Sequence, residues 1–154
     1  MDFNPIPILP SGWRDLRQVV RVERECFGAD AWPALDILAV LAFPGVVRLK
    51  AVDAGEIVGF AAGEERDGAG WITTIGVLSA YRRHGLGRAL LAACEDRLKH
   101  QRIRLCVRTG NLAAQKLYLD TGYVQVDVWK RYYTGGEDAL VLEKENLHFL
   151  GSFQ

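Results

Sequence analysis

Hydrophobic and polar positions divide the chain into short amphipathic helices and strands. The clearest helix includes RALLAACEDRLKH, and Leu86 just before this run forms a stripe at helical spacing with Leu90, Leu91, Cys94 and Leu98. Three β-rich runs, VVRLKAVDA, EIVGFAAGEER and WITTIGVL, are separated by AGE and DGAG turns and predict an antiparallel meander. IRLCVR follows the long helix, so we expect it to run parallel to a neighbouring strand.

The remaining segments complete the order of elements. A short strand around residues 6–9 precedes a helix over about 12–27, which Ser11 is placed to cap, and a second helix covers about 34–42. NLAAQKLYLDTG predicts a helix that begins at Asn111 and ends at Gly122. YVQVDVWKRYY and DALVLEKE predict a final hairpin. The order β-α-α-β-β-β-α-β-α-β-β predicts an α+β fold, with about four helices on a mixed sheet of about seven strands.

Composition predicts a single domain over residues 1–154, with 145–154 as a C-terminal tail that either packs on the sheet or meets a second subunit. Nineteen Lys and Arg residues balance nineteen Asp and Glu residues, which argues against a general nucleic-acid or anionic-membrane binder. A signal peptide and an apolar run of about 18 residues are lacking, so we expect a cytoplasmic protein, either monomer or homodimer. The three cysteines and three histidines are scattered, which predicts no metal site.

The stretch YRRHGLGRALL lies where a strand ends and the long helix begins. The first amides of a helix have no internal partners and concentrate partial positive charge. Glycines let an anion approach such amides, and Arg82, Arg83 and Arg88 add local positive charge to a neutral chain. Neither a GxxxxGK(S/T) loop nor the third glycine of the dinucleotide-binding pattern is present. The stretch therefore predicts a diphosphate site of another kind, the alternative being a helix start with a solvated basic rim.

Two separated segments resemble those of the GNAT acetyltransferase superfamily. RRHGLG fits the family's R/Q-x-x-G-x-G/A loop, and the segment from Asn111 to Tyr123 is similar to its N-x-x-A-x-x-LY-x-x-x-G-F/Y segment. The resemblance covers nearly the whole chain and implies the GNAT fold with acetyl-CoA as co-substrate. It implies that backbone groups of Ile75 and Val77 pair with the pantetheine arm and that loop amides hold the diphosphate. The implied cofactor residues are Ile75, Val77, Arg82, Arg83, His84, Gly85, Leu86, Gly87, Arg88 and Asn111.

The same resemblance assigns catalytic roles. Tyr118 matches the tyrosine that protonates the leaving sulfur, and a backbone N–H near Val77 is the implied donor to the oxyanion. The tail WKRYYTGGEDALVLEKE is similar to that of bacterial ribosomal-protein-alanine N-acetyltransferases and archaeal N-terminal acetyltransferases. Those bacterial enzymes carry a glutamate where this chain has Cys106, and a thiol of ordinary pKa is a poor general base. The sequence leaves the general base open. Either no strong base is needed, or another carboxylate serves, and the candidates by position are Glu23, Glu25, Glu64 and Glu65.

The resemblance also predicts where the acceptor binds. Tyr132 and Tyr133 are expected to clamp a peptide backbone over the active-site mouth, or else they only finish the hairpin. Trp32 and Pro33 are expected to line the opposite wall. The nearby acidic pair at 137 and 138 either stabilises this loop or meets the incoming ammonium group.

Amine basicity favours one class of acceptor. An α-amine has a pKa near 7.7–8.0, so roughly a tenth or more is neutral at pH 7, whereas only about four in ten thousand lysine amines are. A site without its usual carboxylate therefore suits a protein or peptide N-terminus. A GNAT enzyme for a small-molecule amine and a non-catalytic acyl-CoA-binding sensor are the alternatives, and the retained Tyr118 argues against the sensor.

Overall fold

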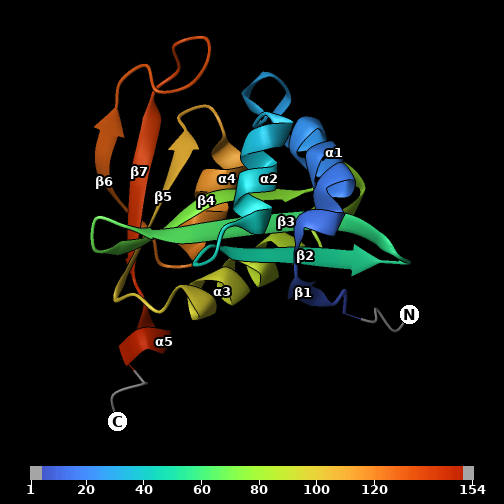
Figure 1. Cartoon of the computed structure of the whole chain (residues 1–154). Helices are drawn as coiled ribbons and strands as arrows, with labels where there is room; N and C mark the ends of the chain where they lie inside the picture. The colour runs from blue at the N-terminus through green and yellow to red at the C-terminus, as the bar shows by residue number, and fades with distance from the viewer. Residues whose placement is uncertain (1–4, 151–154) are drawn as a thin grey trace.

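The computed structural model describes residues 5–150, in which a seven-stranded sheet carries helices on both faces (Figure 1). The predicted α+β class and order of elements are confirmed, and a short helix is added after the last strand. The elements are β1 (Ile8–Pro10), α1 (Leu16–Phe27), α2 (Ala34–Ala42), β2 (Val47–Asp53), β3 (Glu56–Arg66), β4 (Ala69–Val77), α3 (Leu86–Leu98), β5 (Arg102–Arg108), α4 (Leu112–Asp120), β6 (Val124–Trp129), β7 (Ala139–Glu145) and α5 (Leu147–Leu150). Three 3-10 turns, η1 (Trp13–Asp15), η2 (Gly28–Asp30) and η3 (Ser79–Tyr81), join them.

The strands lie in the order β1-β2-β3-β4-β5-β7-β6. The predicted meander of β2, β3 and β4 is antiparallel, and β5 runs parallel to β4 as expected from the helix between them. The final hairpin of β6 and β7 is also confirmed. Its second strand, β7, is the inner one in the sheet and lies between β5 and the edge strand β6. One parallel step thus divides the sheet into two antiparallel halves.

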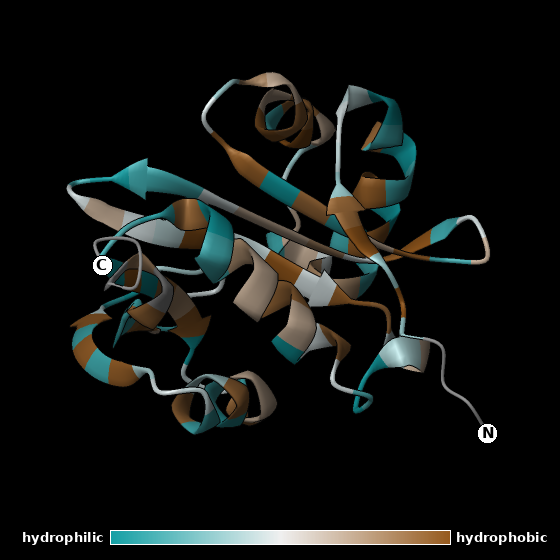
Figure 2. Ribbon diagram, turned by 90° about the horizontal axis from the view of Figure 1, so that it is seen from below, coloured by the Kyte–Doolittle hydropathy of each residue, from teal (hydrophilic) through white to brown (hydrophobic). Residues whose placement is uncertain are grey.

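Two hydrophobic layers hold the helices to the sheet. The predicted stripe of α3 is buried throughout and packs on one face together with Tyr118 of α4. On the opposite face, Val19 and Val22 of α1 and Ile37 of α2 pack on Phe60 of β3. Figure 2 shows hydrophobic and hydrophilic colours following one another along several strands, as expected where one side chain faces the core and the next faces away from it.

Two local predictions are wrong. Ser11 caps no helix: its hydroxyl donates to Asp15 (3.0 Å), which itself precedes α1. The first strand of the final hairpin does not include Tyr132 and Tyr133, because β6 ends at Trp129. Arg131 then takes a positive φ of 53° and donates its amide to Asp138, which turns the chain out of the sheet.

The described part of the tail folds back on the molecule. Asn146 is buried, and its side chain donates to the Glu95 carbonyl of α3 (3.1 Å) while its amide donates to the Gln101 carbonyl (2.7 Å). Residues 151–154 of the predicted tail lie outside the described residues. Within residues 5–150, no helix is long and apolar enough to cross a membrane, and no cluster of three or more His, Cys, Asp or Glu side chains could hold a metal ion.

Candidate active site

The two central strands separate after a short paired stretch. β4 and β5 pair only from Gly70 to Ile72 and from Ile103 to Leu105. Beyond that point β4 continues along β3 as far as Val77, and β5 continues along β7 as far as Arg108. A gap therefore opens in the plane of the sheet between the carboxyl ends of two parallel strands, a common position for ligand sites.

A β-bulge lies where the strands part. Ala62 of β3 faces Thr74, but the next residue, Gly63, faces Ile72, so Thr73 is an extra residue in β4. Its hydroxyl donates to the Ala62 carbonyl (3.2 Å). The bulge reverses the faces of β4, because Ile72 packs with the α3 layer whereas Thr74 contacts α1.

The backbone of β4 beyond the bulge faces the gap at alternate residues. The Leu78 amide donates to the Val58 carbonyl (2.9 Å), so Leu78 and Gly76 direct their backbone groups toward β3. Ile75 and Val77 therefore direct theirs toward the gap, where the predicted pantetheine contacts require them. The Val77 carbonyl already accepts from Arg82 Nε (2.9 Å) and from the Cys26 thiol (3.4 Å), which leaves its amide as the polar group offered to a ligand.

A cavity of about 530 Å³ joins this gap to the glycine loop and α4. Most of the predicted cofactor residues line it: Ile75, Val77, Arg82, Arg83, Gly85, Gly87, Arg88 and Asn111. Tyr118 lines it too, as do Cys26 and Phe27 at the end of α1. Sequence reasoning missed these two α1 residues, since nothing in the local pattern shows that α1 ends against Gly76 of β4.

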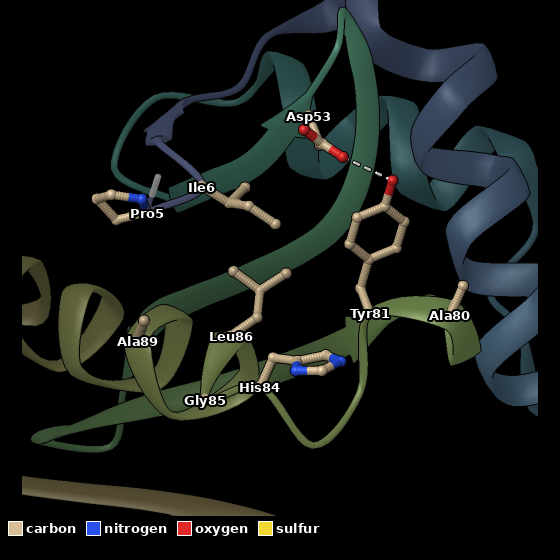
Figure 3. A pocket seen from close by; sticks show the side chains of 9 residues that line it. All are labelled: Pro5, Ile6, Asp53, Ala80, Tyr81, His84, Gly85, Leu86 and Ala89. Atoms are coloured by element: carbon tan, nitrogen blue, oxygen red, sulfur yellow. Dashed lines mark hydrogen bonds between the residues drawn. The ribbon is translucent and has the colours of Figure 1, made fainter. Parts of the chain in front are cut away.

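His84 and Leu86 lie apart from the other predicted cofactor residues. Their side chains line a second cavity, of about 630 Å³, on the other side of the glycine loop (Figure 3). Leu86 is part of the hydrophobic core, and in Figure 3 its side chain points toward that of Ile6. The wall of this cavity also contains a hydrogen bond from the Tyr81 hydroxyl to Asp53 (2.7 Å). Neither residue lines the first cavity, so a contact of either one with the cofactor stays a prediction.

The helix start at the glycine loop is open to an anion. Gly85 precedes α3 with a φ of 81°, and Arg83 has a φ of 64°. Both residues are therefore in the left-handed region of backbone conformation, which sets the direction of the amides in this loop. No side chain in the described part of the chain caps α3, whereas the Asn111 side chain accepts from the Ala114 amide (3.2 Å) and caps α4 as predicted. The free amides at the start of α3 suit a diphosphate.

Gly87 has no packing reason to be glycine. A Cβ built there would lie 3.7 Å from Leu117 Cδ2 and 3.9 Å from Val77 Cγ2, which are ordinary contacts, and its φ is not in the left-handed region. Both neighbours line the first cavity, so the Cβ would project toward it. A ligand that approaches the backbone closely explains the glycine, and the residues present therefore fit the diphosphate of coenzyme A.

Tyr118 stands at the inner wall of the cavity. Its side chain is buried, and its ring meets that of Tyr123 edge to face, with centroids 5.8 Å apart. Burial raises the pKa of the Tyr118 phenol well above its usual value of 10, so the hydroxyl carries its proton throughout the physiological range. It is thus held as a neutral acid.

The predicted acceptor residues lie on two separate segments, and none of the four lines the described cavity, so their role stays a prediction. Trp32 packs against the α1–α2 layer, and Pro33 is exposed directly before α2. Tyr132 and Tyr133 lie together in the β6–β7 loop, with ring centroids 5.0 Å apart and perpendicular planes. Burial raises the pKa of Tyr133, Cys106, Tyr132 and Tyr118 raise it further, and the Arg108 guanidinium opposes the shift.

Cys106 is not equipped to act as a base. Its side chain is half-buried beside Trp71 and Val141, and burial raises the pKa of its thiol to about 11. Below that pH the group is a neutral thiol, which holds rather than accepts a proton. The glutamate expected at this position therefore has no functional equivalent in Cys106.

The carboxylates proposed as alternatives are mostly engaged elsewhere. Glu23 is buried under β4 and accepts from the Thr74 hydroxyl (2.7 Å), and burial raises the pKa of its carboxyl. Glu25 accepts from Ser79 (3.2 Å), Glu65 lies 3.3 Å from His100, and Glu64 is half-buried in β3. None of the four lines the described cavity.

The acidic pair at the mouth is bound into its own loop. Glu137 accepts from the Gly110 amide (2.8 Å) and from Arg108, and these contacts lower the pKa of its carboxyl. Asp138 accepts from the Arg131 amide and from Lys130 (3.1 Å), which lower its pKa as well. Of the two roles left open for this pair, loop stabilisation is the one that these contacts support.

Comparison with known proteins agrees with this geometry. Residues 13–123 match the acetyltransferase (GNAT) family. The chain is 32% identical over 151 residues to an N-alpha-acetyltransferase, RimI, of Mycobacterium tuberculosis, covering 94% of this chain and 96% of that protein. The chain belongs to the GNAT acetyltransferase family. The family predicted from the two motifs is thereby confirmed, and with it the enzyme class, acetyl transfer from acetyl-CoA to an amine.

Solved structures with this GNAT fold include close matches in architecture. The crystal structure of the ribosomal-protein-S18-alanine N-acetyltransferase from Escherichia coli superposes with a TM-score of 0.83 at 25% identity, over 92% of this chain and 94% of that one. Arabidopsis thaliana NAA60 in complex with acetyl-CoA superposes with a TM-score of 0.79 at 20% identity, over 92% of this chain and 99% of that one. The second match supports the fold alone.

Proposed function

We propose that this GNAT enzyme acetylates the α-amine of a protein or peptide N-terminus, acting as one domain over residues 1–154 in the cytoplasm. The observation that carries the proposal is that, among residues 5–150, no carboxylate lines the cavity that holds Tyr118 and Val77. A largely protonated lysine side chain would need a base there, whereas an α-amine near its pKa does not. The name of the Mycobacterium tuberculosis relative, an N-alpha-acetyltransferase, supports the same class of acceptor.

The chain's own groups divide the chemistry between the two sides of the gap. Acetyl-CoA supplies the acetyl group as a thioester. The loop amides and the arginines hold its diphosphate, and the backbone of Ile75 aligns its arm along β4. The Val77 amide is placed to stabilise negative charge on the carbonyl oxygen. As the C–N bond forms and the C–S bond breaks, Tyr118, which burial keeps protonated, would donate its proton to the departing sulfur, and the proton released by the amine nitrogen would restore the phenol.

The deciding experiment compares acceptors under identical conditions. Purified protein and acetyl-CoA are offered Ala-, Ser- and Met-starting peptides, the same peptides with blocked N-termini and an internal lysine, and small amines such as polyamines. We expect the free N-termini to be acetylated with the highest kcat/KM. Faster acetylation of lysine side chains would refute the proposal, and selective acetylation of small amines would establish the alternative enzyme. Tight CoA binding without turnover of any acceptor would establish the sensor.

A further inference from the structure

Arg108 ends β5 at the mouth of the gap. Side chains alternate along a strand, and Ile103, Leu105 and Val107 are buried in the α3 layer. Arg108 therefore shares the opposite face with Cys106, the face on which the predicted acceptor residues lie. Its side chain is only 27% exposed.

One guanidinium group contacts two different segments of the chain. Arg108 donates to the carboxylate of Asp30 in η2, two residues before Trp32. It also donates to Glu137 Oε2 (3.0 Å) and to the Thr134 carbonyl (3.4 Å), both in the β6–β7 loop. The same guanidinium lies 4.4 Å from the centroid of the Tyr133 ring. The two walls of the predicted acceptor site are thus joined through a single side chain.

The contacts between the two segments require a positively charged side chain at position 108, and its charge and shape favour arginine. Asp30 and Glu137 would repel each other across the mouth without a cation between them, and their side chains are only 20% and 33% exposed. The fork of a guanidinium can donate to both carboxylates at once while its face lies on an aromatic ring. A lysine ammonium is a point charge and cannot keep all three contacts.

The hydrogen bonds around Arg108 also extend to α4, which lines the cofactor cavity. Glu137 uses its other oxygen to accept from the Gly110 amide (2.8 Å), directly before Asn111, which caps α4. Gln115 of α4 in turn donates to the Arg108 carbonyl (2.9 Å). The helix that carries Tyr118 is therefore fixed relative to the same strand end that fixes both acceptor walls.

We propose that Arg108 is a positioning residue that sets the spacing between the α1–α2 connection and the β6–β7 loop, and so the fit of the acceptor peptide. The inference deepens the proposed function and rests on it for the identity of the acceptor. Arg108 does not line the described cofactor cavity, and in this proposal it acts through Tyr133 on one wall and through the segment around Trp32 on the other. Loss of the connection should weaken acceptor binding and leave cofactor binding intact.

Steady-state kinetics with a matched control test this role. Arg108→Lys and Asp30→Asn are compared with Arg104→Lys, since Arg104 lies on the same face of β5 and pairs with Glu143 (2.6 Å) away from both loops. We expect Arg108→Lys and Asp30→Asn to raise the KM for an Ala-starting peptide about tenfold, with the KM for acetyl-CoA within about twofold of wild type. Arg104→Lys should change neither. Parallel rises in both KM values, or an equal peptide effect in the control, would overturn the proposal.

Hydrogen exchange tests the connection without reference to activity. In Arg108→Lys we expect the amides of residues 28–32 and 130–138 to exchange faster together, by about threefold or more, while those of α3 keep the wild-type rate. Faster exchange in only one of the two segments, or in neither, would refute the joint role of Arg108. A wild-type protein that acetylates no peptide would refute the proposed function, and the exchange result would still decide the role of Arg108.

Discussion

Replacement of Gly87 by alanine separates the needs of the ligand from those of the fold. Alanine is more favourable than glycine inside a helix by up to about 1 kcal/mol. The new Cβ would meet Leu117 and Val77 at 3.7 and 3.9 Å, so packing adds no penalty. We therefore expect the unliganded Gly87→Ala protein to be as stable as wild type or more stable, by up to about 1 kcal/mol. For a chain of this length that corresponds to a rise of about 2–4 °C in Tm.

The same substitution should weaken CoA binding. The Cβ would stand where the diphosphate approaches the first amides of α3, and the loss of one hydrogen bond to a charged group costs about 1.5–3 kcal/mol. The dissociation constant for CoA should therefore rise about 10- to 150-fold. Isothermal titration calorimetry measures this constant, and urea unfolding of the free protein measures the stability.

Ala92→Gly supplies the matched control, because Ala92 is exposed on α3 away from the cavity. This variant should lose up to about 1 kcal/mol of stability and bind CoA normally. Two results would refute the reasoning. Unchanged CoA affinity in Gly87→Ala would mean that these amides do not hold the diphosphate, and a large loss of stability would mean that the fold itself requires the glycine.

Three further substitutions test the site. Tyr118→Phe should lower kcat about 10²-fold or more with little change in CoA affinity, because it removes only the proton donor, and an unchanged kcat in stopped-flow or steady-state assays would contradict this role. Asn111→Ala should cost about 1 kcal/mol of unfolding free energy through loss of the α4 cap, with Asn111→Asp retaining most of it in urea titrations. Burial raises the pKa of Glu23 above its unfolded value, so the stability linked to its protonation is present at low pH and is lost as pH rises through the folded pKa. Glu23→Gln should therefore show a smaller fall in Tm between pH 4 and pH 8 than wild type, and an identical pH dependence would contradict the assigned shift.

The local sequence pattern was sufficient to predict the helices and strands, because residue spacing and capping act over a few neighbouring residues. The stripe from Leu86 to Leu98 predicted a helix and its buried face, since both follow from a period of 3.6 residues. Asn111 and Gly122 marked the ends of α4 through capping chemistry that acts over a few residues. The error at Ser11 has the same origin, because a hydroxyl before a helix can cap it but here meets Asp15 instead.

Contacts between distant residues escaped prediction. The order of β6 and β7 in the sheet depends on which strand edge is free after β5 is placed, and no single strand carries that information. Cys26 reaches the cofactor cavity only because α1 ends against Gly76, where a Cβ would lie 3.0 Å from the Cys26 sulfur. The role of Glu137 and Asp138 likewise depends on hydrogen-bond partners elsewhere in the chain.

The sequence by itself determined the alternation of strands and helices, the open helix start at the glycine loop and the family to which they belong, because spacing and backbone preference act between near neighbours. The tertiary structure decided where these parts meet. It introduced the bulge at Thr73, opened the gap between β4 and β5, and brought residues 30, 108 and 137 to one point. Pairing between strands and between distant charges is set by the packing of the whole sheet, and so only the folded chain can show it.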